Sequence, residues 1–235
     1  MLLNFLTLAT DVSTLESDYQ IQFMYSFTPG YRFAGDMNLP VISNESEKSV
    51  IPLPWGIQFN PERAIRQYWI PVEGILKNPA SRGLIRTRRC AVLTNCYYMK
   101  NQHEVLLLYK PSEPVLWLAG IWNEIKKPGE PAISGFAILT RPAPPKLAPL
   151  AGRVPVVLTR SRVRGYLNVK KPLMDISWIL REVYYPGLNG HTIDPSVIGK
   201  NEWSRKDLLP SGKKFFSDNK LPEGPILNTR NYFWR

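Results

Sequence analysis

The chain has 235 residues, of which 44% are hydrophobic and 21% charged, so it can fold as one large domain with an extension. No run of about 18 apolar residues occurs, which excludes a transmembrane helix. The short apolar start has no basic residue before it, which argues against a secretory signal. Cys90 and Cys96 lie in one apolar segment, and in a single strand they would be ~20 Å apart, too far for a disulfide. We therefore expect a cytoplasmic protein.

The positive charge is concentrated in the central part of the chain. The net charge is +11, yet residues 81–181 contain 17 Lys and Arg against 5 Asp and Glu, a local balance of +12. Residues 1–80 carry −3 and residues 182–235 carry +2. A local excess of this size favours a polyanionic partner, either nucleic acid or an acidic protein surface. A basic surface that is merely solvated is the alternative.

The first third of the chain predicts short elements. Ser13 and Glu16 fit a capping box, which predicts a helix that passes into an apolar stretch ending near residue 27. Residues 39–42 and 50–57 have the pattern of short strands with proline at their edges. Asn60 followed by Pro61 is typical of a helix start and predicts a helix over residues 62–68.

The middle of the chain is rich in predicted strands. Four short apolar runs, at residues 90–99, 105–109, 115–122 and 136–140, are separated by charged and turn residues. This spacing predicts consecutive antiparallel strands, and residues 154–158 predict another. Apolar residues recur at helical intervals over residues 175–183, which predicts a helix.

The last part of the chain has a different composition. From Tyr184 onward Gly, Pro, Asn and charged residues dominate, and the chain ends in the aromatic cluster Tyr232, Phe233 and Trp234. We expect one domain over residues 1–183. Residues 184–235 would be an extension with little regular structure, which wraps over the domain or docks on a partner.

The sequence contains no standard catalytic or metal-binding motif. A phosphate loop, a zinc protease motif and a nucleophile elbow are absent, and the two cysteines lack zinc-site spacing. We therefore expect no metal and no cofactor. His103 and His191 are each better interpreted as solvent-exposed residues than as general bases. Cys90 and Cys96 are best interpreted as small buried hydrophobes, since a reactive thiol would need a lowered pKa.

Four tryptophans allow two interpretations. Aromatic rings interleaved with arginine can stack on the bases of single strands. In a strand-rich domain they are more often part of the core, which is the interpretation we favour. Trp55 and Trp69 are the best candidates for exposure. The four residues are Trp55, Trp69, Trp117 and Trp122.

Several segments, in the right order, resemble the SOS response-associated peptidase (SRAP) family. Residues 39–42 and 55–57 are similar to its PVI and WGLIP strands, and residues 79–82 to its PAFR segment. Residues 88–98 resemble RRCLVPADGFYEW, and residues 118–124 resemble FAGLWE. Residues 136–140 and 153–158 resemble ILTT and HDRMPVIL. The resemblance covers roughly residues 15–180. With the run of short strands, it implies an α+β fold with a curved, mainly antiparallel sheet and a few short helices.

The resemblance also implies a chemistry for the family. A cysteine in second position, exposed after methionine removal, attacks an abasic site in single-stranded DNA and forms a covalent DNA–protein cross-link. An asparagine, a glutamate and a histidine position the partners and move protons.

Carried over residue by residue, this set is missing here. The family's catalytic positions are occupied by Leu2, Trp69, Met99 and Ala151. Its DNA-facing arginine is replaced by Pro71, whereas Glu73 and Arg153 are retained. The scaffold segments persist while four separate catalytic positions have changed, which indicates a pseudoenzyme.

We therefore expect a catalytically inactive SRAP-like domain that acts as a binding or scaffold protein. Its partner would be single-stranded nucleic acid or another polyanion, bound through Arg153, Arg160, Arg162, Arg164, Arg88 and Trp55. Two alternatives remain open. One is a structural subunit of a larger assembly with protein partners, docked through the tail. The other is an active enzyme, either of the SRAP type or one that uses Cys90 or Cys96.

Overall fold

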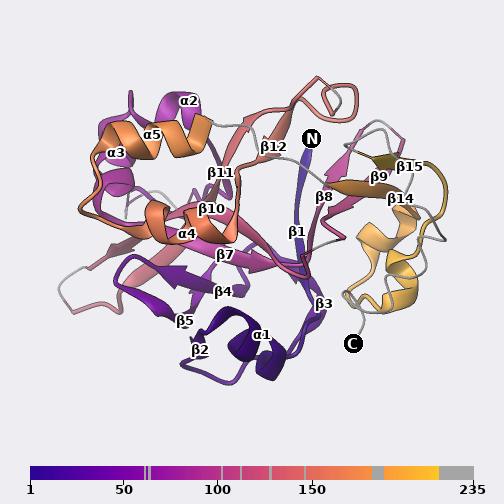
Figure 1. Cartoon of the computed structure of the whole chain (residues 1–235), viewed down its shortest axis with the longest axis horizontal. Helices are drawn as coiled ribbons and strands as arrows, with labels where there is room; N and C mark the ends of the chain where they lie inside the picture. The colour runs from indigo at the N-terminus through magenta and orange to yellow at the C-terminus, as the bar shows by residue number, and fades with distance from the viewer. Residues whose placement is uncertain are drawn as a thin grey trace.

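The chain folds into two mainly antiparallel β-sheets flanked by short helices (Figure 1). The structure is a computed structural model, and it describes residues 1–60, 62, 65–101, 103–111, 113–126, 129–145, 147–181 and 188–216. The α+β class and the antiparallel character predicted from the sequence are confirmed. None of the helices among the described residues is long and apolar enough to cross a membrane.

The smaller sheet has six strands in the order β15-β14-β9-β8-β1-β3, all paired antiparallel. It lies to the right in Figure 1. Its apolar residues pack partly into the main core and partly into a second cluster that includes Trp203 and Leu208. Its strands are β1 (Leu2–Leu8), β3 (Gly30–Ala34), β8 (Cys96–Lys100), β9 (Val105–Tyr109), β14 (Asn189–Ile193) and β15 (Lys214–Phe216).

The larger sheet carries most of the buried core. Seven strands follow the order β12-β11-β10-β7-β4-β5-β2, with β13 paired to β10 and β6 paired to β11. The long strands β10 and β11 are buried over residues 116–122 and 135–140, which explains the apolar runs in these segments. The strands are β2 (Gln22–Phe23), β4 (Asn38–Ser43), β5 (Ser46–Pro54), β6 (Trp69–Pro71), β7 (Arg89–Thr94), β10 (Leu116–Ile125), β11 (Ile133–Pro142), β12 (Arg153–Pro155) and β13 (Val157–Leu158).

The apolar run at residues 90–99 is two strands in two different sheets. Asn95 separates β7 from β8, and its backbone N–H donates to the Thr7 carbonyl oxygen at 2.6 Å. Its side-chain Nδ2 donates to Thr10 Oγ1 at 2.8 Å, and its Oδ1 accepts from the Ala9 N–H at 2.6 Å. One buried amide therefore fixes the point where the chain leaves the larger sheet for the smaller one.

The helices are short, and two of the predicted starts are corrected. The helix α1 (Val12–Tyr19) is capped by Asp11, whose carboxylate accepts from the Thr14 N–H, and not by Ser13. Residues 65–68 are not helical; Asn60 Oδ1 accepts from the Glu62 N–H in a local turn instead. The other helices are α2 (Val72–Ile75), α3 (Pro79–Thr87), α4 (Arg160–Leu167), α5 (Leu173–Arg181) and the 3₁₀ helices η1 (Pro195–Gly199) and η2 (Arg205–Leu208).

The segment after Tyr184 has more regular structure than we expected. Strand β14 pairs with β9 at five positions, β15 pairs with β14, and η1 and η2 lie between them. Residues 189–216 therefore form two strands of the smaller sheet and the 3₁₀ helices beside it. The sequence did not predict these elements because the segment has no hydrophobic periodicity. The aromatic end at residues 232–234 lies outside the described residues, so its docking role stays a prediction.

His191 is buried in β14, contrary to the solvent-exposed position that we expected. Its Nε2 lies 2.8 Å from the Leu208 carbonyl oxygen, and its Nδ1 has no hydrogen-bond partner among the described residues. Burial lowers the pKa of His191. The imidazole is therefore neutral in the folded chain and ionises more readily when unfolded.

This burial predicts a pH dependence of stability. Neutral His191 contributes to the free energy of unfolding. This contribution is fully present above the ordinary histidine pKa of about 6.5 and is lost as the pH falls below it. We expect the urea midpoint to fall between about pH 6.5 and 5, above the range where carboxylates titrate. His191→Gln, which keeps a donor for Leu208, should flatten this slope, whereas His103→Gln at an exposed position should not. Equal slopes for wild type and His191→Gln would contradict the assignment.

Candidate functional site

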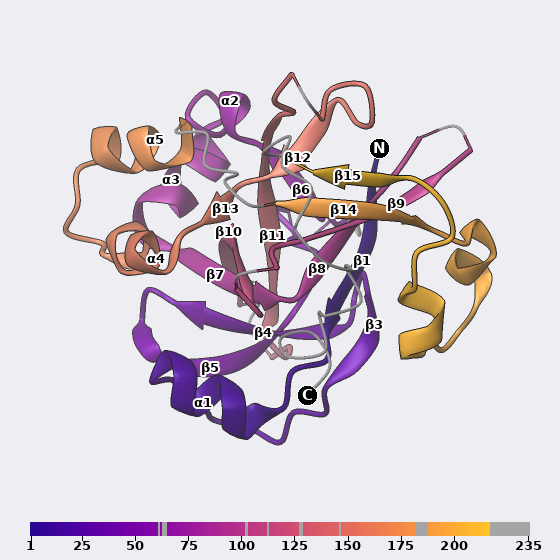
Figure 2. The same ribbon diagram turned by 45° about the vertical axis from the view of Figure 1, so that its right-hand side comes forward.

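An open groove lies beside the start of β1, where the positions assigned by the SRAP resemblance gather. In Figures 1 and 2 the chain's N-terminus lies near β12, at one end of β1. The groove has a volume of about 620 Å³. Its lining comes from the residue before β1, the β8–β9 turn, the segment before β12 and the residue before β15. The residues are Met1, Asn101, His103, Glu104, Ala148, Pro149, Leu150, Ala151, Gly152 and Lys213.

Of the four positions that the resemblance assigns as catalytic, Ala151 lines the groove, and the other three lie on β1 or contact it. Leu2 pairs with Met99 across β1 and β8, so the nucleophile position and the glutamate position are direct neighbours. Trp69 occupies the family's asparagine position, and its Nε1 donates to Asn4 Oδ1 at 2.6 Å. Asn4 lies in β1 two residues after Leu2, so this bond joins Trp69 to β1. Ala151, at the histidine position, lines the groove together with Met1. The residue-by-residue mapping is thus spatially coherent, and the side chains at these positions are hydrocarbon, thioether or indole.

The two retained family residues form one polar contact. Arg153 donates to the Glu73 carboxylate at 2.7 Å. It also donates to two oxygens of Thr140, the side-chain Oγ1 at 3.0 Å and the backbone carbonyl oxygen at 2.9 Å. The bond from Arg153 and its positive charge lower the pKa of Glu73, although desolvation, the largest single influence, opposes them. Glu73 is therefore an ionised partner of Arg153 and is poorly suited to donate a proton near neutral pH.

The titratable side chains Glu104 and His103 line the groove from the β8–β9 turn and do not occupy the catalytic positions assigned by the resemblance. Glu104 accepts from Asn101 Nδ2 at 3.0 Å and forms an ion pair with Lys213 at 3.0 Å. These two contacts lower the pKa of Glu104. His103 is exposed and is the histidine that lines the groove. Within the described part of the chain, His, Cys, Asp and Glu do not gather in groups of three that could hold a metal ion.

The two cysteines are buried and lie away from the groove lining. Cys90 in β7 and Cys96 in β8 are both free and fully buried, as the sequence indicated. Burial raises the pKa of Cys96 to about 12 and raises that of Cys90 further still. Neither thiol is therefore available as a thiolate near neutral pH.

Three of the predicted nucleic-acid contacts lie on α4, and each contacts a different neighbouring element. Arg160 lies over the Tyr19 ring at 5.1 Å, and Arg162 lies over the Trp178 ring at 5.6 Å. Arg164 is 83% exposed and lies 3.9 Å from the Glu47 carboxylate. We call Arg160, Arg162 and Arg164 the α4 arginine surface.

The other three predicted contacts lie elsewhere, so the six residues do not form one surface. Arg153 on β12 is engaged by Glu73. Arg88 caps α3, lies over the Trp122 ring at 4.9 Å and donates to Asn123 Oδ1 at 3.3 Å.

The expected stacking role of Trp55 is wrong, whereas the core interpretation that we favour for the tryptophans holds for it. Trp55 is completely buried, packs edge-on against Trp69 and donates its indole N–H to the Tyr68 carbonyl oxygen at 3.1 Å. Trp117 and Trp122 are also buried, which confirms the core interpretation for them. The one largely exposed tryptophan among the described residues is Trp178 on α5.

Comparison with known proteins agrees with this geometry. No curated protein matches the sequence significantly. Among solved structures, a protein from Bacteroides thetaiotaomicron is 18% identical, with a TM-score of 0.78 over 88% of this chain and 99% of that one. A protein from Bordetella bronchiseptica is 15% identical, with a TM-score of 0.68 over 81% and 99%. A phage-related protein from the same organism is 16% identical, with a TM-score of 0.65 over 81% and 93%. The model of the SOS response associated peptidase (SRAP) family matches residues 5–198, and the chain therefore belongs to that family.

Proposed function

We propose that this SRAP domain has lost the covalent chemistry of its family and acts as a binding domain. One observation carries the proposal: the residues at the positions that the resemblance assigns as catalytic are Leu2 paired with Met99, Trp69 bonded to β1, and Ala151 in the groove beside Met1. None of these side chains can attack an aldehyde or transfer a proton.

An enzyme that uses one of the two thiols fits the site poorly. Cys90 and Cys96 are fully buried, and burial raises both pKa values. A nucleophile has to reach its substrate and ionise, and neither thiol satisfies either condition.

Free thiols also support the cytoplasmic location that we propose, since an oxidising compartment favours disulfides.

The binding partner that we propose is nucleic acid, held through the α4 arginine surface. Its support is a set of three arginines on one helix, with Arg160 and Arg164 exposed and Arg162 half-buried, within the central block of the chain that carries the charge excess. Arginine side chains bind phosphate oxygens well, and such contacts depend on charge more than on base sequence. Association with a protein partner in a larger assembly remains the alternative.

We expect this binding to be electrostatic. With all three arginines replaced by alanine, fewer counterions are released, so the slope of log K against log salt for a single strand should become shallower by about 2. The measurement is fluorescence anisotropy of a labelled oligonucleotide between about 50 and 200 mM salt. A triple variant of two residues on α3 and one on η2 (Arg82→Ala, Arg86→Ala and Lys206→Ala) removes the same charge from exposed positions elsewhere. An equal change of slope in both variants would mean that total charge, and not the α4 arginine surface, governs binding.

A further inference from the structure

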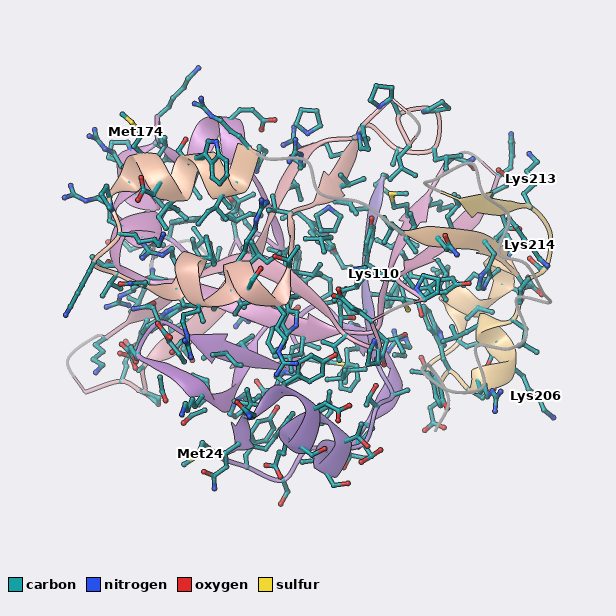
Figure 3. The ribbon with its side chains drawn as sticks, viewed as in Figure 1. Met24, Lys110, Met174, Lys206, Lys213 and Lys214 are labelled. Carbon is teal, nitrogen blue, oxygen red and sulfur yellow. The ribbon has the colours of Figure 1, made fainter. Side chains whose placement is uncertain are left out.

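The outer face of α5 carries large apolar side chains in solvent. The helix packs inward through Ile176, Ile179 and Leu180. On the opposite side Met174 is 81% exposed and Trp178, one helical turn later, is 62% exposed. Figure 3 shows Met174 at the outer edge of α5. Single exposed apolar residues are ordinary, but an indole and a thioether side by side on one helix face indicate a contact surface.

This face is strongly basic. Residues 160–181 contain six Lys and Arg against one acidic residue, Asp175. The guanidinium of Arg162 on α4 lies 5.6 Å from the centre of the Trp178 ring on α5, so the two helices contribute one arginine–indole pair. Lys170 and Lys171, in the turn between the helices, are both exposed. The charge therefore surrounds the apolar side chains and is complementary to a polyanion.

The combination favours nucleic acid over an acidic protein. Lysine is depleted in protein–protein interfaces, whereas two consecutive lysines flank this face. An exposed indole next to arginines suits a single strand, because every unpaired base has a π-face that can stack on it. A duplex keeps its bases stacked inside and cannot use the ring in this way.

We propose that Trp178 is a stacking platform for a base of single-stranded nucleic acid, while Arg162, Lys170 and Lys171 contact the neighbouring phosphates. This inference rests on the proposed nucleic-acid binding and adds a preference for single strands. The site is separate from the groove at Leu2: in Figures 1 and 2, α4 and α5 lie to the left of β1.

The test compares one single strand with one duplex. A labelled oligothymidine of about 15 nucleotides and a duplex of equal length are titrated with wild type and variants. Trp178→Ala should weaken single-strand binding about tenfold and change duplex binding less than about twofold. Trp178→Phe should keep most of the affinity, whereas Trp178→Leu, which retains apolar area without a π-face, should behave like Trp178→Ala. Met24→Ala, at an exposed apolar position near β2, is the control for loss of apolar surface.

The outcomes separate this inference from the function on which it rests. If the α4 triple variant loses binding but Trp178→Ala binds both probes normally, the stacking inference fails and the proposed function stands. If wild type binds neither probe, both fail. Trp178-dependent binding to a polyglutamate peptide or to phosphatidylserine vesicles, without binding to the oligothymidine, would assign this face to a protein or a membrane and overturn the inference.

Discussion

Replacing Arg89 with methionine should destabilise the fold by about 3 kcal/mol or more. Arg89 is only 1% exposed, and its guanidinium donates to four backbone carbonyl oxygens. Two belong to Ile85 and Arg86 near the end of α3, and two belong to Tyr166 and Asn168 at the end of α4. The side chain thus joins two helix C-termini, whose carbonyl dipoles favour a positive charge.

The expected loss follows from the acceptors that remain. An apolar replacement removes the donors, but the four carbonyl oxygens stay in place, and each buried acceptor left without a partner costs about 1–3 kcal/mol. Arg89→Lys keeps the charge without the planar fork and should fall between wild type and Arg89→Met. Arg86→Met, on the exposed side of α3, should change stability by less than about 0.5 kcal/mol. Urea unfolding followed by circular dichroism measures all three, and an Arg89→Met variant as stable as Arg86→Met would contradict this role.

Introducing the missing nucleophile should restore little chemistry. In Leu2→Cys a thiol stands at the family's nucleophile position, but Met99 and Ala151 still cannot move protons. Acid–base assistance contributes about 10²–10⁴ in rate, so Leu2→Cys should cross-link an abasic oligonucleotide at least about a hundredfold more slowly than a family member with the full set.

Adding one proton carrier provides the matched comparison. Ala151 lines the groove, so Leu2→Cys combined with Ala151→His places an imidazole at its rim. We expect the double variant to react faster than Leu2→Cys, and Leu2→Ser with Ala151→His to stay inactive because a hydroxyl is a weaker nucleophile. Cross-linking by Leu2→Cys alone at the rate of the complete family site would show that the other positions do not limit the reaction.

The strands were the most predictable part of the fold. The apolar runs at residues 105–109, 115–122 and 136–140 correspond to β9, β10 and β11, because strands buried on both faces leave a continuous apolar signal. The same continuity hid the division at Asn95, where one polar residue transfers the chain between sheets. Strand β14 was missed because Gly190, His191 and Thr192 carry no apolar pattern, although they are buried.

The sequence predicted which residues occupy the family's catalytic positions, but it predicted poorly which aromatic and basic side chains are exposed. The motif order alone paired the positions of Leu2 and Met99, and the structure places Ala151 in the groove beside Met1. Exposure was harder to predict, because the buried Trp55 and the exposed Trp178 are the same residue type in apolar surroundings. Arg88 and Arg89 are adjacent arginines, yet only the second is buried. The contacts that decide this, at Tyr166 and Asn168, lie nearly 80 residues away.

Incubating the unmodified chain with single-stranded DNA that contains an abasic site tests the loss of covalent chemistry most directly. The products are separated on a denaturing gel, beside a family member that has cysteine at the position of Leu2. We predict a shifted band for that control and none for this chain, because Leu2 offers no nucleophile and both thiols are buried. A stable shifted band for this chain, resistant to denaturant and dependent on the abasic site, would contradict the proposed loss of chemistry.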